Sequence, residues 1–248
     1  MARIRIIYGF HSVRSALRRA GDDVQEIFFD AARTDPRAKE LLELAEQKAA
    51  RVMIVDAVRL DGLTGHTRHQ GVAAKLVANP LSTDIDEILD AANTPPLLLV
   101  LDGVQDPRNL GACLRVADAM GVHVVIAPKD NSVGITPVVS KAASGAAENV
   151  PFVMVTNLAR TLRGLKDRNI WFVALDENGE EELNRANLTG PLGMVFGAEG
   201  PGLRRLTREV CDRSVRIPMF GSVESLNVSV AAGVCLYEVQ RQRSLATK

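Results

Sequence analysis

The feature that most constrains the fold is a regular alternation of apolar runs and helical patterns that begins at Leu97. The apolar runs are continuous, which is typical of strands buried on both faces of a parallel sheet. They span residues 97–101, 122–127, 151–155, 170–175, 192–196 and 214–217, and a last helix is predicted from about Asn227 to Arg241. By this pattern alone, residues 97–248 form an α/β domain with a mostly parallel sheet, as in doubly wound Rossmann-like folds.

The first part of the chain predicts a separate, smaller α/β unit over residues 1–78. Strands are expected at residues 4–8, 24–29, 52–55 and 71–77, and helices at 11–19 and 36–49. Residues 79–96 begin with Asn-Pro and end with Thr-Pro-Pro, which is typical of a connector. Apolar residues within it have helical spacing, so a short helix is expected there. We therefore predict two domains, 1–78 and 97–248, joined by a linker.

Composition limits what the chain can bind. Hydrophobic residues make up 46% of the 248 residues, so the chain can bury a sizeable core, and the formal net charge is zero, which excludes a histone-like polycation. Residues 1–78 carry 13 Lys and Arg against 10 Asp and Glu, whereas residues 79–248 carry 17 against 20. This small asymmetry favours the first domain as the contact for a polyanion.

Cysteine usage and hydropathy point to the cytoplasm. The three cysteines are scattered without metal-ligand spacing, which predicts reduced thiols and no metal site. No apolar run reaches the roughly 18–20 residues that span a membrane. The arginines before Asp22, without an intervening acid, also fit a mitochondrial transit peptide. Because the same residues fit a strand followed by a helix, we favour a folded segment in a cytoplasmic protein.

A first polar motif follows the predicted strand at 97–101. Asp106-Pro107 is a good helix start, and an apolar stripe on the helix should face the core. Another face carries Gly111 and Ala112, which have little or no side chain and would let another molecule approach, with Arg115 projecting over the gap. The alternative is that Arg115 is an ordinary surface residue of an amphipathic helix.

Two further motifs follow later predicted strands. Residues 197–202 read G-x-x-G-x-G, which is not the dinucleotide-binding fingerprint, and Glu199 within them needs a donor such as Arg115 if it is buried. Residues 217–231 pass from a strand through a Gly/Ser turn into a helix. There Ser225 and Asn227 stand beside free backbone N–H groups, which suits a polar small molecule. Both side chains would equally serve as helix caps.

These three motifs, in this order, resemble the SpoU branch of the SPOUT RNA methyltransferases. The sequences Tyr-Gly-Phe-His-Ser-Val at residues 8–13 and His-Gln-Gly at 69–71 extend the resemblance to the first domain. The resemblance implies an L30e-like substrate-binding domain followed by a catalytic domain whose C-terminal segment forms a deep trefoil knot. It implies methyl transfer from S-adenosylmethionine to the ribose 2'-hydroxyl of one guanosine in the peptidyl-transferase region of 23S ribosomal RNA, as free RNA or in a pre-50S particle, in the bacterial cytoplasm.

The resemblance also assigns roles to residues. Asn109, Arg115, Glu199, Ser225 and Asn227 match catalytic positions, and Gly197, Ile217, Leu226 and Asn227 match the cofactor site. We expect Arg115 to act electrostatically, because a guanidinium remains protonated in proteins and is a poor base. The last helix is apolar almost all round, so it is buried within the monomer or in the homodimer interface that the family implies.

Contacts to RNA are expected from the first domain. Arg14, Arg18, Arg68 and His69 are the candidates, although Arg14 and Arg18 also fit a solvated helix face. Other functions remain open at this point: a tRNA or antibiotic-resistance rRNA 2'-O-methyltransferase, a Rossmann-type oxidoreductase, or a non-catalytic RNA-binding assembly factor.

Overall fold

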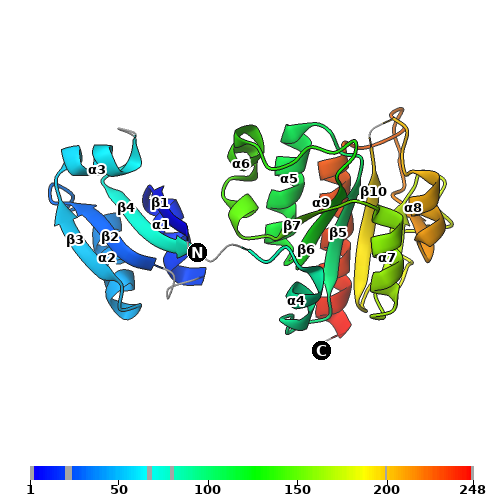
Figure 1. The fold of residues 1–248 in the computed structure, drawn as a ribbon, viewed down its shortest axis with the longest axis horizontal. Helices are drawn as coiled ribbons and strands as arrows, with labels where there is room; N and C mark the ends of the chain where they lie inside the picture. Colours follow the sequence, from blue (N-terminus) through cyan, green and yellow to red (C-terminus); the bar gives the residue numbers. More distant parts are fainter. Residues whose placement is uncertain (1–2, 20–23, 66–68, 79–80, 199, 247–248) are drawn as a thin grey trace. The chain divides into compact units, whose positions relative to one another are not determined.

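The computed structural model describes residues 3–19, 24–65, 69–78, 81–198 and 200–246. The chain divides into two compact units, Met1–Pro80 and Leu81–Lys248, each of which is described by itself. Figure 1 shows both units as mixtures of helices and strands.

The first unit is a four-stranded sheet with helices on both faces. The strands β1 (Arg3–Tyr8), β2 (Val24–Asp30), β3 (Arg51–Val55) and β4 (Val72–Ala78) lie in the order β1-β4-β2-β3. Successive side chains of a strand point to opposite faces, and β2 shows this directly. Ile27 and Phe29 join the core beneath α1 (Phe10–Arg19) and α2 (Pro36–Gln47), whereas Phe28 packs with Leu60 of α3 (Ala57–Thr64). The predicted α/β unit is confirmed, and α3 is an addition to it.

The second unit is built on a seven-stranded sheet, in which each described strand pair is parallel. The strand order is β7-β6-β5-β10-β8-β11-β9. The strands are β5 (Leu97–Asp102), β6 (Val124–Pro128), β7 (Phe152–Val155), β8 (Trp171–Leu175), β9 (Glu181–Glu182), β10 (Leu192–Gly197) and β11 (Arg213–Arg216). The mostly parallel sheet that the apolar runs predict is therefore confirmed, and only the two-residue strand β9 lacks a counterpart in the sequence pattern.

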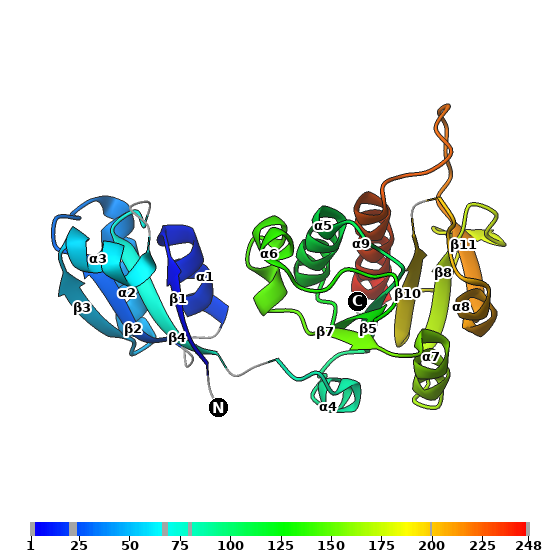
Figure 2. The same ribbon diagram turned by 45° about the horizontal axis from the view of Figure 1, so that its top comes forward.

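Helices cover both faces of this sheet (Figure 2). On one face lie α5 (Pro107–Ala119), α6 (Pro137–Ala143) and α9 (Val228–Ala246), and on the other α4 (Ile85–Asp90), α7 (Leu158–Lys166) and α8 (Arg205–Val210). In the central strand β5, Leu99 packs with the first helix layer and Leu98 with the second. A short 3-10 helix, Ala146–Glu148, follows α6.

The expected linker of residues 79–96 is shorter in the structure, because the chain from Leu81 onward belongs to the second unit. Ile85 and Ile88 of α4 pack against its core. Arg168 donates to Asp86 Oδ1 at 2.6 Å and also to Asp90 on the same helix. Residues 79 and 80 lie outside the described ranges.

Helix α9 is buried on one face only. Its buried residues are Val228, Ala231, Ala232, Cys235, Leu236 and Val239. On the other side Val230, Val234 and Tyr237 are exposed, at 51%, 40% and 61% of their surfaces. The alternative in which a single chain buries this helix on every side is therefore wrong.

The end of α9 is tied to the start of the sheet. Arg243 donates to the carbonyl oxygens of Pro95, Pro96 and Gly190, which precede β5 and β10. Burial lowers the pKa of the Arg243 guanidinium.

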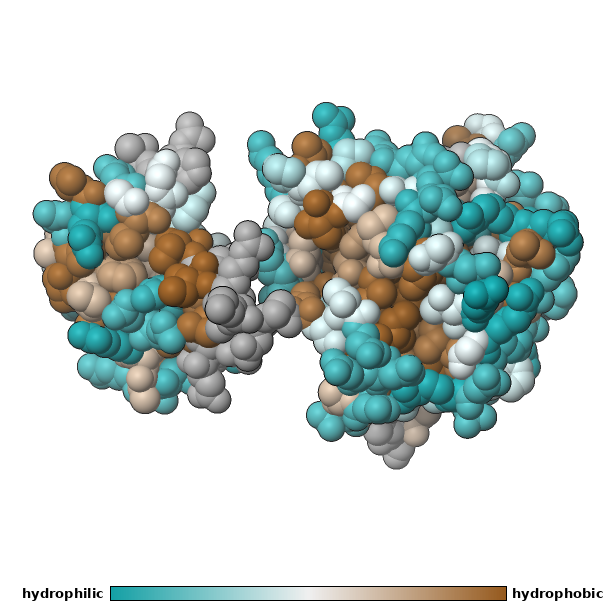
Figure 3. All heavy atoms as spheres, viewed as in Figure 1, coloured by the Kyte–Doolittle hydropathy of each residue, from teal (hydrophilic) through white to brown (hydrophobic). Residues whose placement is uncertain are grey.

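Some large apolar residues are exposed at the surface. Apolar side chains are interspersed with polar ones on the visible face of each unit (Figure 3). The exposed large apolar residues include Ile54 and Val58 in the first unit. None of the helices within the described ranges is long and apolar enough to cross a bilayer.

Candidate active site

The three sequence motifs come together at the carboxyl ends of the parallel strands. The first follows β5, the second follows β10, which pairs directly with β5, and the third connects β11 to α9. Loops at this edge of a parallel sheet form the usual ligand-binding crevice. Here they enclose two neighbouring cavities.

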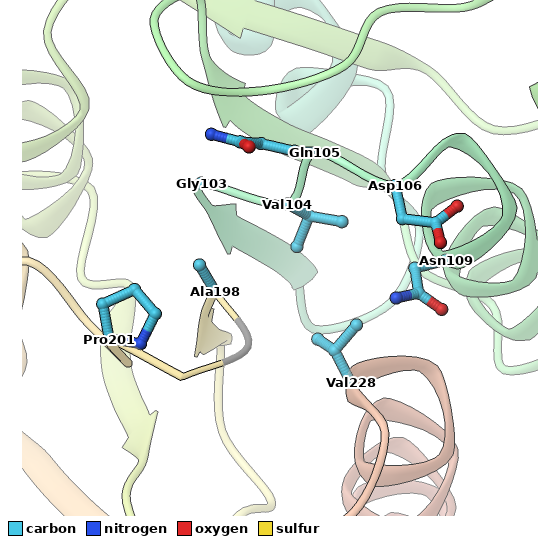
Figure 4. Close-up of a pocket in the computed structure, with 8 residues that line it drawn as sticks. All are labelled: Gly103, Val104, Gln105, Asp106, Asn109, Ala198, Pro201 and Val228. Atoms are coloured by element: carbon cyan, nitrogen blue, oxygen red, sulfur yellow. The ribbon is translucent and has the colours of Figure 1, made fainter.

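The smaller cavity has a volume of about 340 Å³ and lies where all three motifs meet (Figure 4). Its walls come from the loop after β5, the start of α5, the loop after β10 and the start of α9. The lining residues are Gly103, Val104, Gln105, Asp106, Asn109, Ala198, Pro201 and Val228.

The larger cavity, of about 820 Å³, combines an apolar wall with charged groups. Leu175, Phe196, Ile217, Leu226 and Ala231 form part of the apolar wall, and Asp176, Glu177, Arg208, Arg216 and Glu224 are the charged residues. Ala198, Pro201 and Val228 line both cavities. The two cavities therefore adjoin at these residues, and ligands bound in them would lie next to each other.

Asn109 and Asn227, which are 118 positions apart in sequence, are joined at the smaller cavity. Asn227 Nδ2 donates to Asn109 Oδ1 at 2.9 Å. Asn227 Oδ1 in turn accepts from the backbone N and the Oγ of Ser229, so Asn227 also caps α9. The capping interpretation is therefore confirmed for Asn227, and its role in the site stays a prediction. Ser225 and Leu226 line the larger cavity, as does Ile217.

Arg115 lies on the exposed side of α5, and its Nη1 donates weakly to Ser144 Oγ at 3.5 Å. Among the residues that the structure describes, Arg115 lines neither cavity. The open face expected beside it is not open. A Cβ on Gly111 would stand 2.5 Å from Ala142 Cβ and 2.8 Å from the Val139 carbonyl, so α6 of the same chain fills this space.

Gly197 lines the larger cavity. Its lack of a side chain allows close approach of the protein's own backbone, and not of a ligand as expected. An added Cβ would overlap the backbone of Gly202 and Leu203, not a space reserved for a ligand. The loop folds back on β10 here, with Ala198 N and Gly202 N each donating to the other residue's carbonyl at 3.2 and 3.0 Å. Gly197 is therefore needed for the turn of the second motif. Glu199 lies outside the described residues.

Two ion pairs beside the cavities were not expected from the sequence. Asp102, at the end of β5, is 1% exposed and binds Arg204, and Asp176, at the end of β8, pairs with Arg208 at 2.6 Å. Each acid stands at the carboxyl end of a buried strand. This position in the sequence is the signal from which a role near the site could have been predicted.

The predicted RNA contacts differ in exposure. Arg18 is exposed, and Arg14 is partly exposed and donates to Glu40 Oε1 at 3.3 Å. His69 is 6% exposed, with Nε2 at 3.1 Å from Asp61 Oδ1 and Nδ1 accepting from the backbone N of Gly71. The prediction of His69 as a surface contact therefore conflicts with its buried, structural position. Arg68 lies outside the described residues.

The three cysteines are free thiols. Burial raises the pKa of Cys113, Cys211 and Cys235 to about 12, so all three are protonated at neutral pH. No cluster of His, Cys, Asp and Glu within the described ranges could hold a metal ion.

Comparison with known proteins identifies the family of this chain. The SpoU rRNA Methylase family matches residues 96–237, and the family described as RNA 2'-O ribose methyltransferase substrate binding matches residues 6–81. Fold and site thus define an RNA 2'-O-methyltransferase that uses S-adenosylmethionine. The chain belongs to the SpoU rRNA methylase family, whose catalytic domain is a trefoil knot.

Curated relatives match over almost the whole length. The 23S rRNA (guanosine-2'-O-)-methyltransferase RlmB of Ralstonia nicotianae is 56% identical, over 99% of this chain and 98% of that protein. The protein of the same name from Nitrosomonas europaea is 51% identical, over 100% and 95%.

Solved structures agree. The SpoU methyltransferase AviRb of Streptomyces viridochromogenes, in complex with AdoMet, has a TM-score of 0.67 and 25% identity, over 98% of this chain and 91% of its own. The TrmH/SpoU tRNA modifying enzyme of A. aeolicus has a TM-score of 0.57 and 31% identity, over 62% and 78%. The predicted resemblance is therefore confirmed, and a Rossmann-type oxidoreductase is excluded.

The larger cavity fits the cofactor. S-adenosylmethionine joins a flat adenine to a ribose and a zwitterionic amino acid, so it needs an apolar slot beside polar groups. The apolar wall that includes Ile217 and Leu226 offers the slot, and the ion pair of Asp176 and Arg208 offers charged partners.

Proposed function

We propose that this protein methylates the ribose 2'-hydroxyl of a specific guanosine in the peptidyl-transferase region of 23S ribosomal RNA. The observation that carries the proposal is the wall of Ala198, Pro201 and Val228 shared by the two cavities. It would bring a methyl donor in the larger cavity next to a nucleoside in the smaller one. The curated relatives named above, at 51% and 56% identity, support 23S rRNA as the substrate.

In this proposal the donor is held in the larger cavity by Gly197, Ile217, Leu226 and their neighbours. Bound S-adenosylmethionine supplies an electrophilic methyl group on its sulfonium. Most of the rate enhancement then comes from alignment of the acceptor hydroxyl with that methyl group.

The acceptor side of the site belongs to the first and third motifs. The hydrogen-bonded amides of Asn109 and Asn227 would orient the ribose at the shared wall, and Ser225 would contact the donor. We assign Arg115 to the phosphate beside the target and to the developing alkoxide. Its positive charge stabilises both, without the guanidinium acting as a base. Glu199 remains a proposed site residue on the family pattern.

We propose that the first unit binds the RNA and the second performs the transfer. The match of residues 6–81 to a substrate-binding family supports the assignment, as do the exposed side chain of Arg18 and the partly exposed side chain of Arg14. The chain would act in the cytoplasm, on 23S RNA or a pre-50S particle.

We also propose a homodimer, supported by the exposed apolar row of Val230, Val234 and Tyr237 on α9. An apolar helix face of this kind is covered in a stable protein. Val234→Asp should convert the protein to a monomer in light scattering, whereas Val58→Asp, an equally apolar surface site on the first unit, should leave a dimer. A dimeric Val234→Asp protein would refute this interface.

The decisive experiment is transfer of a tritiated methyl group to undermethylated 23S RNA and to pre-50S particles, with mapping of the modified nucleotide. The expected result is one 2'-O-methylated guanosine in the peptidyl-transferase region. Methylation of tRNA alone, or transfer to a different class of rRNA site, would replace the proposal by another substrate of the family. An absence of any transfer with bound cofactor would favour an assembly factor instead.

A further inference from the structure

A buried carboxylate ties the first motif to the second. Asp102 ends β5, and its side chain is fully buried, although it belongs to neither cavity wall. Its Oδ1 accepts from Nε of Arg204 at 2.6 Å and lies 2.5 Å from Nη2, while Oδ2 accepts from the backbone N of Arg204 at 3.1 Å. Both carboxylate oxygens are thus bound to one residue, which follows the loop of the second motif.

This contact joins two loops that leave neighbouring parallel strands. Asp102 is paired with Gly197 in the sheet, and this is the last pair between β5 and β10. The loop after Asp102 continues along the smaller cavity, and the loop after Gly197 borders both cavities before it reaches Arg204. The backbone hydrogen bonds between Ala198 and Gly202 hold the second loop to itself, not to the first loop.

We propose that the Asp102–Arg204 pair is a positioning device for the methyl transfer. By holding the exit of the second loop against the end of β5, it fixes the shared wall and so the distance between donor and acceptor. Arg204 and Asp102 are positioning residues, because they act through Ala198 and Pro201. The inference rests on the proposed use of the two cavities for donor and acceptor.

We expect loss of the Asp102–Arg204 pair to have a strong effect on the rate of methyl transfer. A buried carboxylate that loses its partner is expensive to keep charged, so the pair and its geometry are held together tightly. Because the guanidinium binds Oδ1 and the backbone N binds Oδ2, the carboxylate is held at both oxygens, which fixes its orientation as well as its distance from Arg204. Displacement by about 1 Å of groups that align reactants can lower a rate by about 100-fold.

Arg204→Ala tests the proposal, with Arg205→Ala as the matched control. Arg205 is the next residue, at the start of α8, and its guanidinium pairs with the exposed Glu209 at 2.6 Å on the surface. We expect Arg204→Ala to lower kcat by about 10-fold to 100-fold, with KM for S-adenosylmethionine and for RNA within about threefold of wild type. Arg205→Ala should match wild type in all three constants.

Asp102→Asn keeps the shape of the side chain and removes its charge. We expect Asp102→Asn to lower kcat as Arg204→Ala does. The double variant should have a kcat no lower than that of the less active single variant, because both substitutions remove the same interaction. Three results would each overturn the proposal. They are additive losses of kcat in the double variant, a kcat of Arg204→Ala equal to that of Arg205→Ala, and an effect of Arg204→Ala confined to KM for the cofactor.

A second readout does not depend on the substrate. Amide hydrogen exchange at Ala198 and Gly202 should become at least about tenfold faster in Arg204→Ala and remain unchanged in Arg205→Ala, because the loop loses its anchor. Unchanged exchange in Arg204→Ala would overturn the positioning role even if wild type proved inactive on 23S RNA. Inactive wild type with the expected exchange would instead refute only the proposed substrate.

Discussion

Gly111 offers a sharp test of how closely α5 and α6 must pack. Replacing a helical glycine by alanine normally stabilises a helix by about 1 kcal/mol. At Gly111 the new Cβ would stand 2.5 Å from Ala142 Cβ, 2.8 Å from the Val139 carbonyl oxygen and 3.1 Å from the backbone N of Ala143. Two of these neighbours are backbone atoms, so α6 as a whole must move away from α5.

The clash should exceed the gain in helix propensity. Overpacking a tight contact costs about 1–3 kcal/mol, and the rigid neighbours of Gly111 place it toward the upper end. We therefore expect Gly111→Ala to lower the free energy of unfolding by about 1–2 kcal/mol. Gly164 in α7 is the matched control, because a Cβ there meets no atom within 4 Å among the described residues. Gly164→Ala should raise the free energy of unfolding by about 0.5–1 kcal/mol.

The assay can be confined to the second unit. Trp171 is the single tryptophan of the chain and lies on β8, so its fluorescence follows unfolding of that unit. A difference of about 1.5–3 kcal/mol between the variants corresponds to about 3–12 °C in the unfolding midpoint for a domain of this size. If Gly111→Ala proves as stable as Gly164→Ala, the close approach of the two helices does not depend on Gly111.

Further predictions address the chemistry, the pH dependence and the division of labour. Arg115→Ala should abolish methyl transfer while calorimetry shows S-adenosylmethionine affinity within a few-fold of wild type, and Arg115→Lys should also fail, because a point charge does not replace a planar fork; an active Arg115→Ala enzyme would contradict the assignment. Burial lowers the pKa of His123, so its contribution to stability is complete above the unfolded pKa of about 6.5 and is lost as the pH falls through the folded pKa. In urea unfolding, wild type should therefore lose stability between pH 7 and pH 5 faster than His123→Gln, and equal slopes would refute this. A fragment starting at Leu81 should bind cofactor yet lose selective RNA methylation, and full activity would refute the RNA-binding role of the first unit. Neutralising Arg14 and Arg18 together should reduce the slope of log affinity for RNA against log salt by about 0.7–0.9 for each lost contact, and an unchanged slope would make them ordinary surface residues.

The sequence predicts the layers of the fold well, because a strand buried on both faces is a continuous run of apolar residues. The run of apolar residues in β5 could hardly be anything other than a central strand, and it is one. Helix α3 shows a signal that was present and overlooked: Asp56 caps its start, and Gly65 ends it in the left-handed conformation. Its short length and internal Gly62 hid the helical periodicity.

The site was predictable only through family likeness. Periodicity places Asn109 and Asn227 on two helices but says nothing of the hydrogen bond between them. Asp102 and Asp106 look alike in sequence, since each is an acid after an apolar strand. Yet the first is buried against Arg204 and the second is an exposed helix cap. The face of Gly111 was misjudged for a related reason, because the pattern of α5 does not record that α6 docks there.

Helix α9 links segments that lie far apart in the sequence. Val228, at its start, lines both cavities, and Arg243, near its end, donates to carbonyl oxygens that precede β5 and β10. Contacts between such distant segments form slowly, because long loops must close before the contacts can be made. A chain with α9 undocked would keep the strands of the sheet but would lack Val228 in the lining of both cavities. We therefore expect docking of α9 to be a late step in folding and the step that completes the two cavities.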